Sequence, residues 1–412
     1  MPLPLEGIRV LDFTRVLAGP HATRMLCDLG AEVIKVEPPV GDITRFTRPR
    51  INGVATYYAQ QNVGKRNVSI DLSAPGATDL VADLADRCDV LIENFRPGVM
   101  DKLGLGPAVL RARNPGLVYV SINGYGSTGP LRHKMAYNVV ISAEAGLTKF
   151  QGDARGGVYE SDPSDHADVY SALEAATAVL AALVRRERTG TGDWVEVSMA
   201  HTMLYVNDHL HDQLFDGDVE PGTIRSFGTP QYVVLEVASG ERMAVSGHPA
   251  ESGSFEYFVR ALELDGLGDD PRFGTVADRL EHFAELRAIV AEAALRIPDS
   301  ATFERRFANH RLASGVVQSA RALADSEWAR HRGVIRSIPD RSGGEIRVPT
   351  GPWQFADATP DGPTGSGGSA GDIVSHRGED NRAVLSDVLG LDEATIDDLE
   401  DRGVLSSRAP RV

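Results

Sequence analysis

Asp168 is the first residue to consider for chemistry, because it places a carboxylate at the start of an apolar helical segment. Apolar residues recur every three or four positions after it, which predicts one buried helix face: Val169, Leu173, Ala176, Leu180 and Leu183. The helix is expected to end at Gly190, and a strand to begin at Trp194. Such a carboxylate is either a helix cap or a nucleophile, and local physics alone favours the cap.

Two further segments carry residue types that suit an anionic, aromatic ligand. The first runs from Glu93 to Pro97 and continues to Lys102, so that two cations stand beside a phenylalanine. The second, 124–138, is rich in glycine and then basic at Arg132, His133 and Lys134. Cations suit phosphates and an aromatic ring suits a base edge, but the residues alone favour a solvated loop for the first segment and leave both interpretations open for the second.

Histidines and cysteines give weaker signals. The cluster His201, Asp208, His209, His211 and Asp212 suggests zinc, but two of its histidines are two positions apart and point to different sides of a helix. We therefore expect no metal site. Cys27 and Cys88 both fall within apolar helical patterns, which predicts reduced core thiols.

Composition limits the partners and the compartment. The chain of 412 residues has 42 basic and 58 acidic residues and a net charge of −16, which argues against nucleic acid. A local cluster of cations can still hold an anionic cofactor. No uninterrupted apolar run reaches the roughly 18 residues that span a bilayer, and the first residues lack a signal-peptide pattern. These patterns favour a cytoplasmic protein without a membrane partner.

The first 150 residues alternate short β-rich runs with helical patterns. The expected strands are 7–13, 31–37, 69–72, 89–94 and 117–123, and amphipathic helices are expected at 18–29 and 76–88. This alternation predicts an α/β domain with a doubly wound parallel sheet, whose ligands bind at the carboxyl ends of the strands. The loop 14–20 after the first strand has no GxGxxG, which argues against an NAD-type oxidoreductase.

The pattern changes near residue 225. Two β-rich runs, 231–237 and 242–246, flank Ser239-Gly240 as in a hairpin, and helical stretches follow at 252–263, 276–297 and 301–309. We expect a large domain over 1–224, a smaller α+β domain over 225–320, and a return to the large domain over 321–412. That return contains a Gly/Ser/Pro-rich connector at 359–372 and short helices at 380–389 and 392–402.

Six segments in order resemble the family III CoA-transferases of the CaiB/BaiF group, which includes formyl-CoA transferase and the carnitine CoA-transferase. They are GIRVLDFTRVLAGPHATRMLCDLGAEVIKVE (7–37), GKRNVSIDL (64–72), ENFRPGVMDKLGL (93–105), NGYGSTGP (123–130), ADVYSALEAATAVLAALVRRERTGTG (167–192) and GEDNRAVLSDVLGLDEATIDDLEDRGVL near the C-terminus. The resemblance covers nearly the whole chain. It implies an interlocked homodimer and a nucleophilic role for Asp168.

The resemblance also implies which residues contact coenzyme A. The matching positions are Leu17, Ala18, Ile70, Asp71, Leu72, Ser73, Asn94, Phe95, Arg96, Lys102, Met135, Ala136, Tyr137 and Asn138. Coenzyme A or acyl-CoA is then a substrate, with a carboxylic acid as the other one, and no tightly bound cofactor is expected.

The implied reaction moves CoA between acids through a covalent aspartyl intermediate on Asp168. A free aspartate with a pKa of about 3.9 is ionised at neutral pH, so no general base is needed. The donors for the oxyanion cannot be named from the sequence, and Ser226–Pro230 has one glycine where formyl-CoA transferase has a glycine-rich loop. That difference weakens the expectation of an oxalate-type substrate.

Two alternatives remain open. An α-methylacyl-CoA racemase shares this fold, but Tyr137 and Asn138 stand where a racemase has its His and Asp. A CoA-binding protein without catalysis, in which Asp168 only caps its helix, is the alternative from another class.

Overall fold

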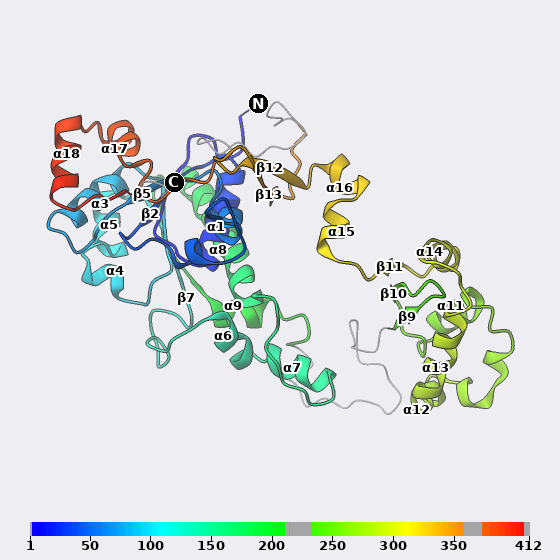
Figure 1. Ribbon diagram of the computed structural model, residues 1–412. Coiled ribbons are helices and arrows are strands. Elements are labelled where there is room, and N and C mark those ends of the chain that lie inside the picture. Colours follow the sequence, from blue (N-terminus) through cyan, green and yellow to red (C-terminus); the bar gives the residue numbers. More distant parts are fainter. Residues whose placement is uncertain (1, 211–213, 215–232, 357–372, 408–412) are drawn as a thin grey trace. The chain divides into compact units, whose positions relative to one another are not determined.

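The computed structural model describes residues 2–210, 214, 233–356 and 373–407. The chain divides into two compact units, one formed by 1–208 with 326–412 and the other by 209–325 (Figure 1). Both limits of the second unit lie outside the expected 225–320. The expected connector 359–372 and the loop 226–230 are not among the described residues.

The first unit is built on a six-stranded sheet in the order β5-β2-β1-β6-β7-β8, and all its neighbouring strands are parallel. The strands are β1 (Arg9–Asp12), β2 (Glu32–Glu37), β5 (Arg66–Ser69), β6 (Val90–Glu93), β7 (Val118–Asn123) and β8 (Trp194–Ser198). In register, Leu11 pairs with Ile34 and with Leu91. The predicted parallel sheet is confirmed, and its order reverses direction between β1 and β6, where ligands of such sheets bind.

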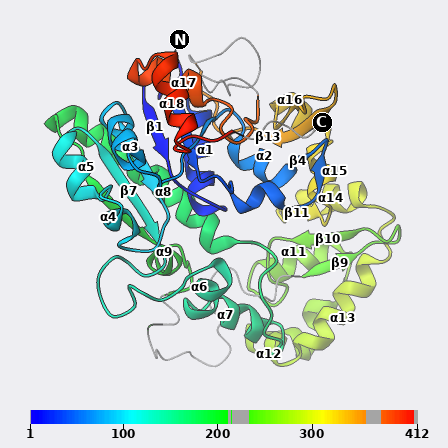
Figure 2. The same ribbon diagram turned by 60° about the vertical axis from the view of Figure 1, so that its left-hand side comes forward.

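Successive residues of each strand enter different cores, because side chains alternate across a sheet. Val10 belongs to a core that contains α1 (Ala18–Asp28) and α8 (His166–Thr189), whereas Leu11 belongs to one with α3 (Ala77–Asp86) and α5 (Pro107–Arg113). The second core also takes in α17 (Asn381–Leu389) and α18 (Glu393–Asp401) from the end of the chain (Figure 2). The sheet is thus covered on both faces, as a doubly wound sheet requires.

The prediction for the third strand was wrong in position. The expected strand 69–72 is observed as β5, Arg66–Ser69, and the chain turns immediately after it. The apolar alternation continues from Ile70 to Ser73, and this extended the predicted strand too far. In the structure Asp71 accepts a hydrogen bond from the Ser73 backbone N–H (2.9 Å), which closes a turn and ends the strand.

The buried face of α8 also differs from the prediction. Its fully buried residues are mostly small, namely Ala167, Ser171, Ala172, Ala175, Ala176, Val179, Ala182 and Leu183. Leu173, expected in the core, is 43% exposed. Small residues let α8 approach α1 and the sheet closely, and the predicted Ala176 and Leu183 lie on this buried face. Gly190 ends the helix with a positive φ, as predicted.

Within the described part of the chain, α8 is also the one helix whose length and hydropathy would allow it to cross a membrane. It contains no uninterrupted apolar run of that length, because Glu174 interrupts it. Of its most apolar window, 44% is buried inside the first unit.

Shorter elements complete the first unit. They are β3 (Arg50–Ile51), β4 (Val54–Ala55), α2 (Thr56–Asn62), α4 (Val99–Lys102), α6 (Asn138–Glu144), α7 (Leu147–Ala154), α9 (Met199–Tyr205), α16 (Glu327–Arg332), β12 (Ile335–Pro339) and β13 (Glu345–Pro349). The antiparallel pair β12-β13 packs against α2 through a small core that contains Tyr58 and Ile346.

The second unit is an antiparallel three-stranded sheet packed against helices. Its elements are β9 (Val234–Glu236), β10 (Arg242–Val245), α11 (Ser254–Ala261), α12 (Val276–Glu281), α13 (Phe283–Ala294), α14 (Ser300–Asn309), β11 (Ser314–Val316) and α15 (Ala320–Ala324). The predicted hairpin is confirmed as β9 and β10, and the expected helix 276–297 is divided at His282. Phe303 and Phe307 stack 3.9 Å apart in the core.

Candidate active site

Asp168 lies in the first turn of α8, but it is not the residue that caps the helix. The N-cap position belongs to Asp165, whose side chain makes no capping hydrogen bond. The Asp168 carboxylate instead accepts a hydrogen bond from the backbone N–H of Ala18, at the start of α1. The interpretation of Asp168 as a helix cap is therefore wrong, because its partner belongs to another helix.

The surroundings of Asp168 disfavour its charge. Burial raises the pKa of its carboxyl to about 6, the nearby Asp165 adds to this rise, and the hydrogen bond from Ala18 opposes it. The sequence-based assumption of an ordinary aspartate is corrected accordingly. At pH 7 the carboxylate is still mostly ionised, but it is poorly hydrated, which favours attack on an electrophile.

Asp168 opens into a cavity of about 330 Å³. Carboxylates line it at Asp162, Asp165 and Asp168, and neutral polar groups line it at Asn138, Ser142, Thr148 and Ser161. The remaining lining residues are Val16, Tyr137 and Val139. Two predicted CoA residues, Tyr137 and Asn138, thus lie at the same cavity as the predicted nucleophile.

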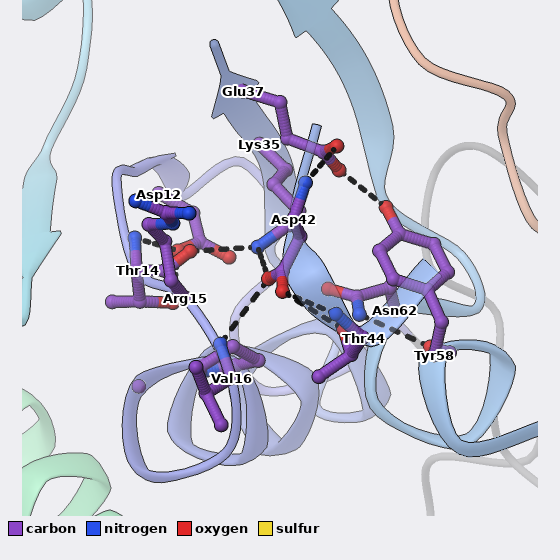
Figure 3. Close-up of polar contacts among 12 residues, drawn as sticks. Asp12, Thr14, Arg15, Val16, Lys35, Glu37, Asp42, Thr44, Tyr58 and Asn62 are labelled. Carbon is purple, nitrogen blue, oxygen red and sulfur yellow. Dashed lines mark hydrogen bonds and ion pairs between the residues drawn. The ribbon is translucent and has the colours of Figure 1, made fainter. Parts of the chain in front are cut away.

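Buried charged side chains hydrogen-bond the backbone of the loop from Thr14 to Leu17, which leads to Ala18 (Figure 3). Asp12 accepts a hydrogen bond from the Thr14 N–H (2.8 Å), Lys35 Nζ donates to the Thr14 carbonyl (2.7 Å), and Asp42 accepts from the Val16 N–H (3.2 Å). Val16 has a φ of 70°, a conformation that side-chain-bearing residues seldom adopt. These bonds fix the strained backbone that presents Ala18.

The buried charges under this loop are paired. Burial opposes the ionisation of Asp12, but Lys65 (3.1 Å) and Lys35 outweigh it and lower the pKa of Asp12 to about 2. Lys35 also pairs with Asp42 at 3.4 Å. Removing one partner of such a pair leaves an uncompensated buried charge, so the pairs keep the loop in one arrangement.

Asn94 links this loop to the next strand along the sheet. Its side-chain amide accepts from the Arg15 N–H (2.8 Å) and donates to the Arg15 carbonyl (2.9 Å). The side-chain amide that was predicted to contact CoA is therefore hydrogen-bonded to the Arg15 backbone, and Asn94 holds the loop 14–17 in position.

Two other predicted CoA segments also meet. Arg96 Nη2 lies 2.9 Å from Met135 Sδ, which brings together the loops after β6 and β7. Gly124 makes this arrangement possible, because a Cβ there would lie 2.2 Å from the Ala136 Cβ.

Asn138 joins α6 to α8. Its Oδ1 accepts a hydrogen bond from the Ala167 N–H (2.9 Å) and lies 3.3 Å from the Ser142 hydroxyl. Because the oxygen is occupied, the orientation of the amide is fixed, and its NH₂ group is the part left to act as a donor beside the cavity.

The remaining predicted residues lie around this centre. Leu17 is buried at the N-cap of α1, Phe95 packs on the core beneath α3, and Lys102 is exposed at the end of α4. Ile70 to Ser73 follow β5, at the outer edge of the sheet, where Ile70 forms a bridge with Leu405. Leu17, Phe95, Lys102 and Ile70 all follow carboxyl ends of strands or the loops that continue from them.

Sequence reasoning missed two titratable groups. Burial, Asp165, Asp168 and Asp42 raise the pKa of Tyr57 to about 12, so its hydroxyl stays protonated near the nucleophile. Burial raises the pKa of Glu93 to about 7, and Glu93 accepts the Phe95 N–H at 2.8 Å. No spacing signal marks Tyr57, but Glu93 ends a buried strand, where a carboxylate is unusual.

Metal and thiol chemistry receive no support from the described residues. No group of three or more His, Cys, Asp and Glu side chains in them could hold a metal ion, while His211 and Asp212 lie outside the described residues. Cys27 and Cys88 are both buried and free, and burial raises the pKa of the Cys27 thiol to about 11. Such a thiol is unreactive.

Comparison with known proteins gives consistent matches. The model of CoA-transferase family III matches residues 5–366. Succinyl-CoA:glutarate CoA-transferase of Mus musculus is 30% identical over 413 residues, which cover 98% of this chain and 90% of that protein. "Probable fatty acyl-CoA transferase Rv3272" of Mycobacterium tuberculosis is 46% identical over 300 residues, 69% of this chain and 75% of that protein. The crystal structure of a CAIB/BAIF family protein from Brucella suis matches with a TM-score of 0.79 and 27% identity, over 94% of this chain and 100% of that one.

Proposed function

The chain belongs to CoA-transferase family III and is a CoA-transferase, and we propose that Asp168 carries the reaction through a covalent aspartyl intermediate. The observation that carries this proposal is the setting of Asp168: a poorly hydrated carboxylate that opens into a cavity at the carboxyl edge of a parallel sheet.

In the first half of the proposed reaction, an Asp168 oxygen attacks the thioester carbon of the donor acyl-CoA. The C–S bond breaks, CoA leaves as a thiolate, and an acyl-aspartyl anhydride remains. The thiolate then attacks the aspartyl carbon, which releases the donor acid as its carboxylate and leaves an aspartyl-CoA thioester.

In the second half, the acceptor carboxylate attacks the aspartyl thioester and expels the thiolate again. The thiolate attacks the acceptor carbon of the new anhydride, so that acceptor acyl-CoA forms and Asp168 is regenerated. Protons are neither consumed nor released overall, which agrees with a site that needs no general base. Acyl-CoA and a carboxylic acid are the only reactants, so no tightly bound cofactor takes part.

Each attack places negative charge on an oxygen, and we propose that the Asn138 NH₂ stabilises it. The fixed orientation of this amide supports the assignment, because a donor that is already oriented needs no reorganisation in the transition state. Arg96 and Lys102 are proposed to compensate phosphate charge on CoA, since Arg96 lies in the loop after β6 and Lys102 at the end of the helix α4 that follows it.

A racemase is the weaker candidate. Racemisation needs a base beside the α-carbon, and no histidine lines the cavity among the residues that the structure describes. Tyr137 stands at the position of the racemase histidine, so a phenol replaces the imidazole that would act as that base. The names of the relatives include both glutarate and fatty acyl groups, so family membership leaves the acyl group open.

We propose further that the active molecule is an interlocked homodimer in the cytoplasm. An apolar surface on α8 and α9 supports dimerisation: Leu173 and Val184 lie about three turns apart on one face of α8, and Leu204 and Tyr205 follow on α9, all of them exposed. The two buried free thiols suit a reducing compartment.

The proposed intermediate is tested by trapping. The protein is exposed to a panel of acyl-CoA compounds, digested, and the mass of the peptide that contains Asp168 is measured. An acyl or CoA adduct on Asp168 is expected with a substrate, and none with Asp168→Asn. Transfer at near wild-type rate by Asp168→Asn, after exclusion of deamidation to Asp, would refute the nucleophile.

A further inference from the structure

All the charged side chains that line the cavity at Asp168 are acidic. Asp162 and Asp165 line it together with the nucleophile. Asp162 is partly buried, yet hydrogen bonds from Gln151 and from the Ser164 N–H (2.7 Å) stabilise its ionised form. Among the residues that the structure describes, no lysine or arginine lines the cavity.

Basic residues stand beside this cavity but do not line it. His166 Nδ1 lies 3.3 Å from Asp162, the charge of Arg155 acts on the same carboxylate, and Lys149 is paired with Asp153 at 2.8 Å. An incoming group with a negative charge would therefore meet like charges at short distance, the most deeply buried of which is Asp168. A second carboxylate on the acyl chain would be such a group.

The rest of the cavity suits a hydrocarbon chain. Val16, Tyr137 and Val139 all line it with side chains that are exposed in this unit. Covering such apolar surface with methylene groups is favourable, whereas covering it with a carboxylate is not.

We propose that this enzyme transfers CoA between monocarboxylic acids with uncharged chains and discriminates against dicarboxylic acids. The inference rests on the proposed function of the Asp168 site and names its substrate class. It predicts a preference opposite to that of a glutarate-specific site.

Self-exchange of CoA tests the inference without knowledge of the physiological acids. Wild-type protein is incubated either with pentanoyl-CoA and ¹³C-pentanoate or with glutaryl-CoA and ¹³C-glutarate, and label in the acyl-CoA is followed by mass spectrometry. The two acids have the same chain length and differ in the terminal carboxylate. We expect kcat/KM for the pentanoyl pair to exceed that for the glutaryl pair by about tenfold or more.

Equal rates, or faster exchange with glutarate, would overturn the inference and leave the transfer function standing. Absence of exchange with these pairs, and also with propanoyl and malonyl and with dodecanoyl and dodecanedioyl pairs, would refute the proposed function itself. The two failures are thus distinguishable.

Charge variants test the cause of the preference. Asp165→Asn removes one carboxylate at a helix N-cap, where Asn is as favourable as Asp, and should lower the pentanoyl-to-glutaryl ratio severalfold. Glu160→Gln makes the same change of charge at an exposed neighbour that does not line the cavity, and should leave the ratio unchanged. If Asp165→Asn and Asp162→Asn both keep the wild-type ratio, the carboxylates do not set the specificity.

Discussion

At the scale of single residues, Asp168 is held where its charge destabilises the fold. Its pKa is raised from 3.8 to about 6, so the native state binds this proton more tightly than the unfolded chain does. Below the unfolded pKa of 3.8 the carboxyl is protonated in both states and costs the fold nothing. As pH rises from there through 6, the folded state must bury the charge and the free energy of unfolding falls. Two units correspond to as much as about 3 kcal/mol of unfolding free energy at neutral pH.

Replacement of Asp168 by Asn should therefore separate stability from activity. At pH 7.5 we expect Asp168→Asn to have a higher melting temperature than wild type while CoA transfer falls by orders of magnitude, because the neutral amide avoids the buried charge and cannot attack. The gain should shrink as pH approaches 4.5, where the wild-type carboxyl is protonated. Melting curves across this range check the prediction, with Glu160→Gln as the control. A gain that does not depend on pH would contradict it.

Asn138 offers a test of the oxyanion assignment. Asn138→Asp keeps an oxygen for the Ala167 N–H but removes the NH₂ donor, whereas Asn138→Ala removes both. We expect kcat to fall by about 10²–10³ in both variants, since loss of one oxyanion donor has that effect. Circular dichroism and melting temperature should show that Asn138→Asp folds normally. Wild-type kcat in Asn138→Asp would assign Asn138 a purely structural role.

The nucleophile could be named from the sequence, but its environment could not. The resemblance over 167–192 identifies Asp168, yet the Ala18 N–H that binds it comes from a helix about 150 residues earlier. The raised pKa depends on that packing and on Asp165. Likewise, the motif predicts Asn94 as a CoA contact, while only the fold reveals that Arg15 occupies its amide.

At the scale of elements, small residues set how closely the functional segments approach. The alanine face of α8 packs against α1, and this contact brings Asp168 to Ala18. Helix periodicity predicted α8 and its end correctly, and it placed Ala176 and Leu183 in the core, but it also placed Leu173 there and missed most of the buried alanines. The buried face depends on which helices pack closely, and a single sequence does not show that.

Gly124 should control the position of the CoA segment 135–138. In Gly124→Ala the new Cβ would overlap the Ala136 Cβ, so the segment must move and CoA binding should weaken about tenfold. Calorimetric titration with CoA measures the effect. The double variant Gly124→Ala with Ala136→Gly should recover affinity, and Gly116→Ala, where a Cβ meets only Asn114 at 3.4 Å, is the control. Unchanged affinity in Gly124→Ala would show that this segment does not contact CoA.

At the scale of the whole molecule, the exposed apolar surface of α8 and α9 should be covered by a second chain. Light scattering is expected to give a mass of about 89 kDa, twice the 44.3 kDa of one chain. Leu173→Asp should shift the protein towards the mass of one chain, because it places a charge in the apolar surface. Val109→Asp, at an exposed site on α5, should not. A wild-type protein that stays at 44.3 kDa would contradict the dimer.

The alternation of strands and helices predicted a parallel sheet, but not the order of its strands. The strand positions were predicted to within a few residues, but the edge position of β5 and its contact with the C-terminal segment were not. Those contacts join residues more than 300 positions apart, and a local pattern carries no information about them.

The edge of β5 has a consequence for synthesis of the chain. Its Asn67 and Ser69 N–H groups donate to the side chains of Asp380 (2.7 Å) and Asn381 (2.8 Å), and the Ser69 carbonyl accepts from the Ser406 N–H (3.1 Å). Until the ribosome has delivered those residues, roughly 15–60 s after β5 at about 5–20 residues per second, this strand presents an open edge to other nascent chains. The edge of β5 therefore stays unpaired until residues 380–406 have been made, so a chain released before them would keep an open strand edge that favours aggregation.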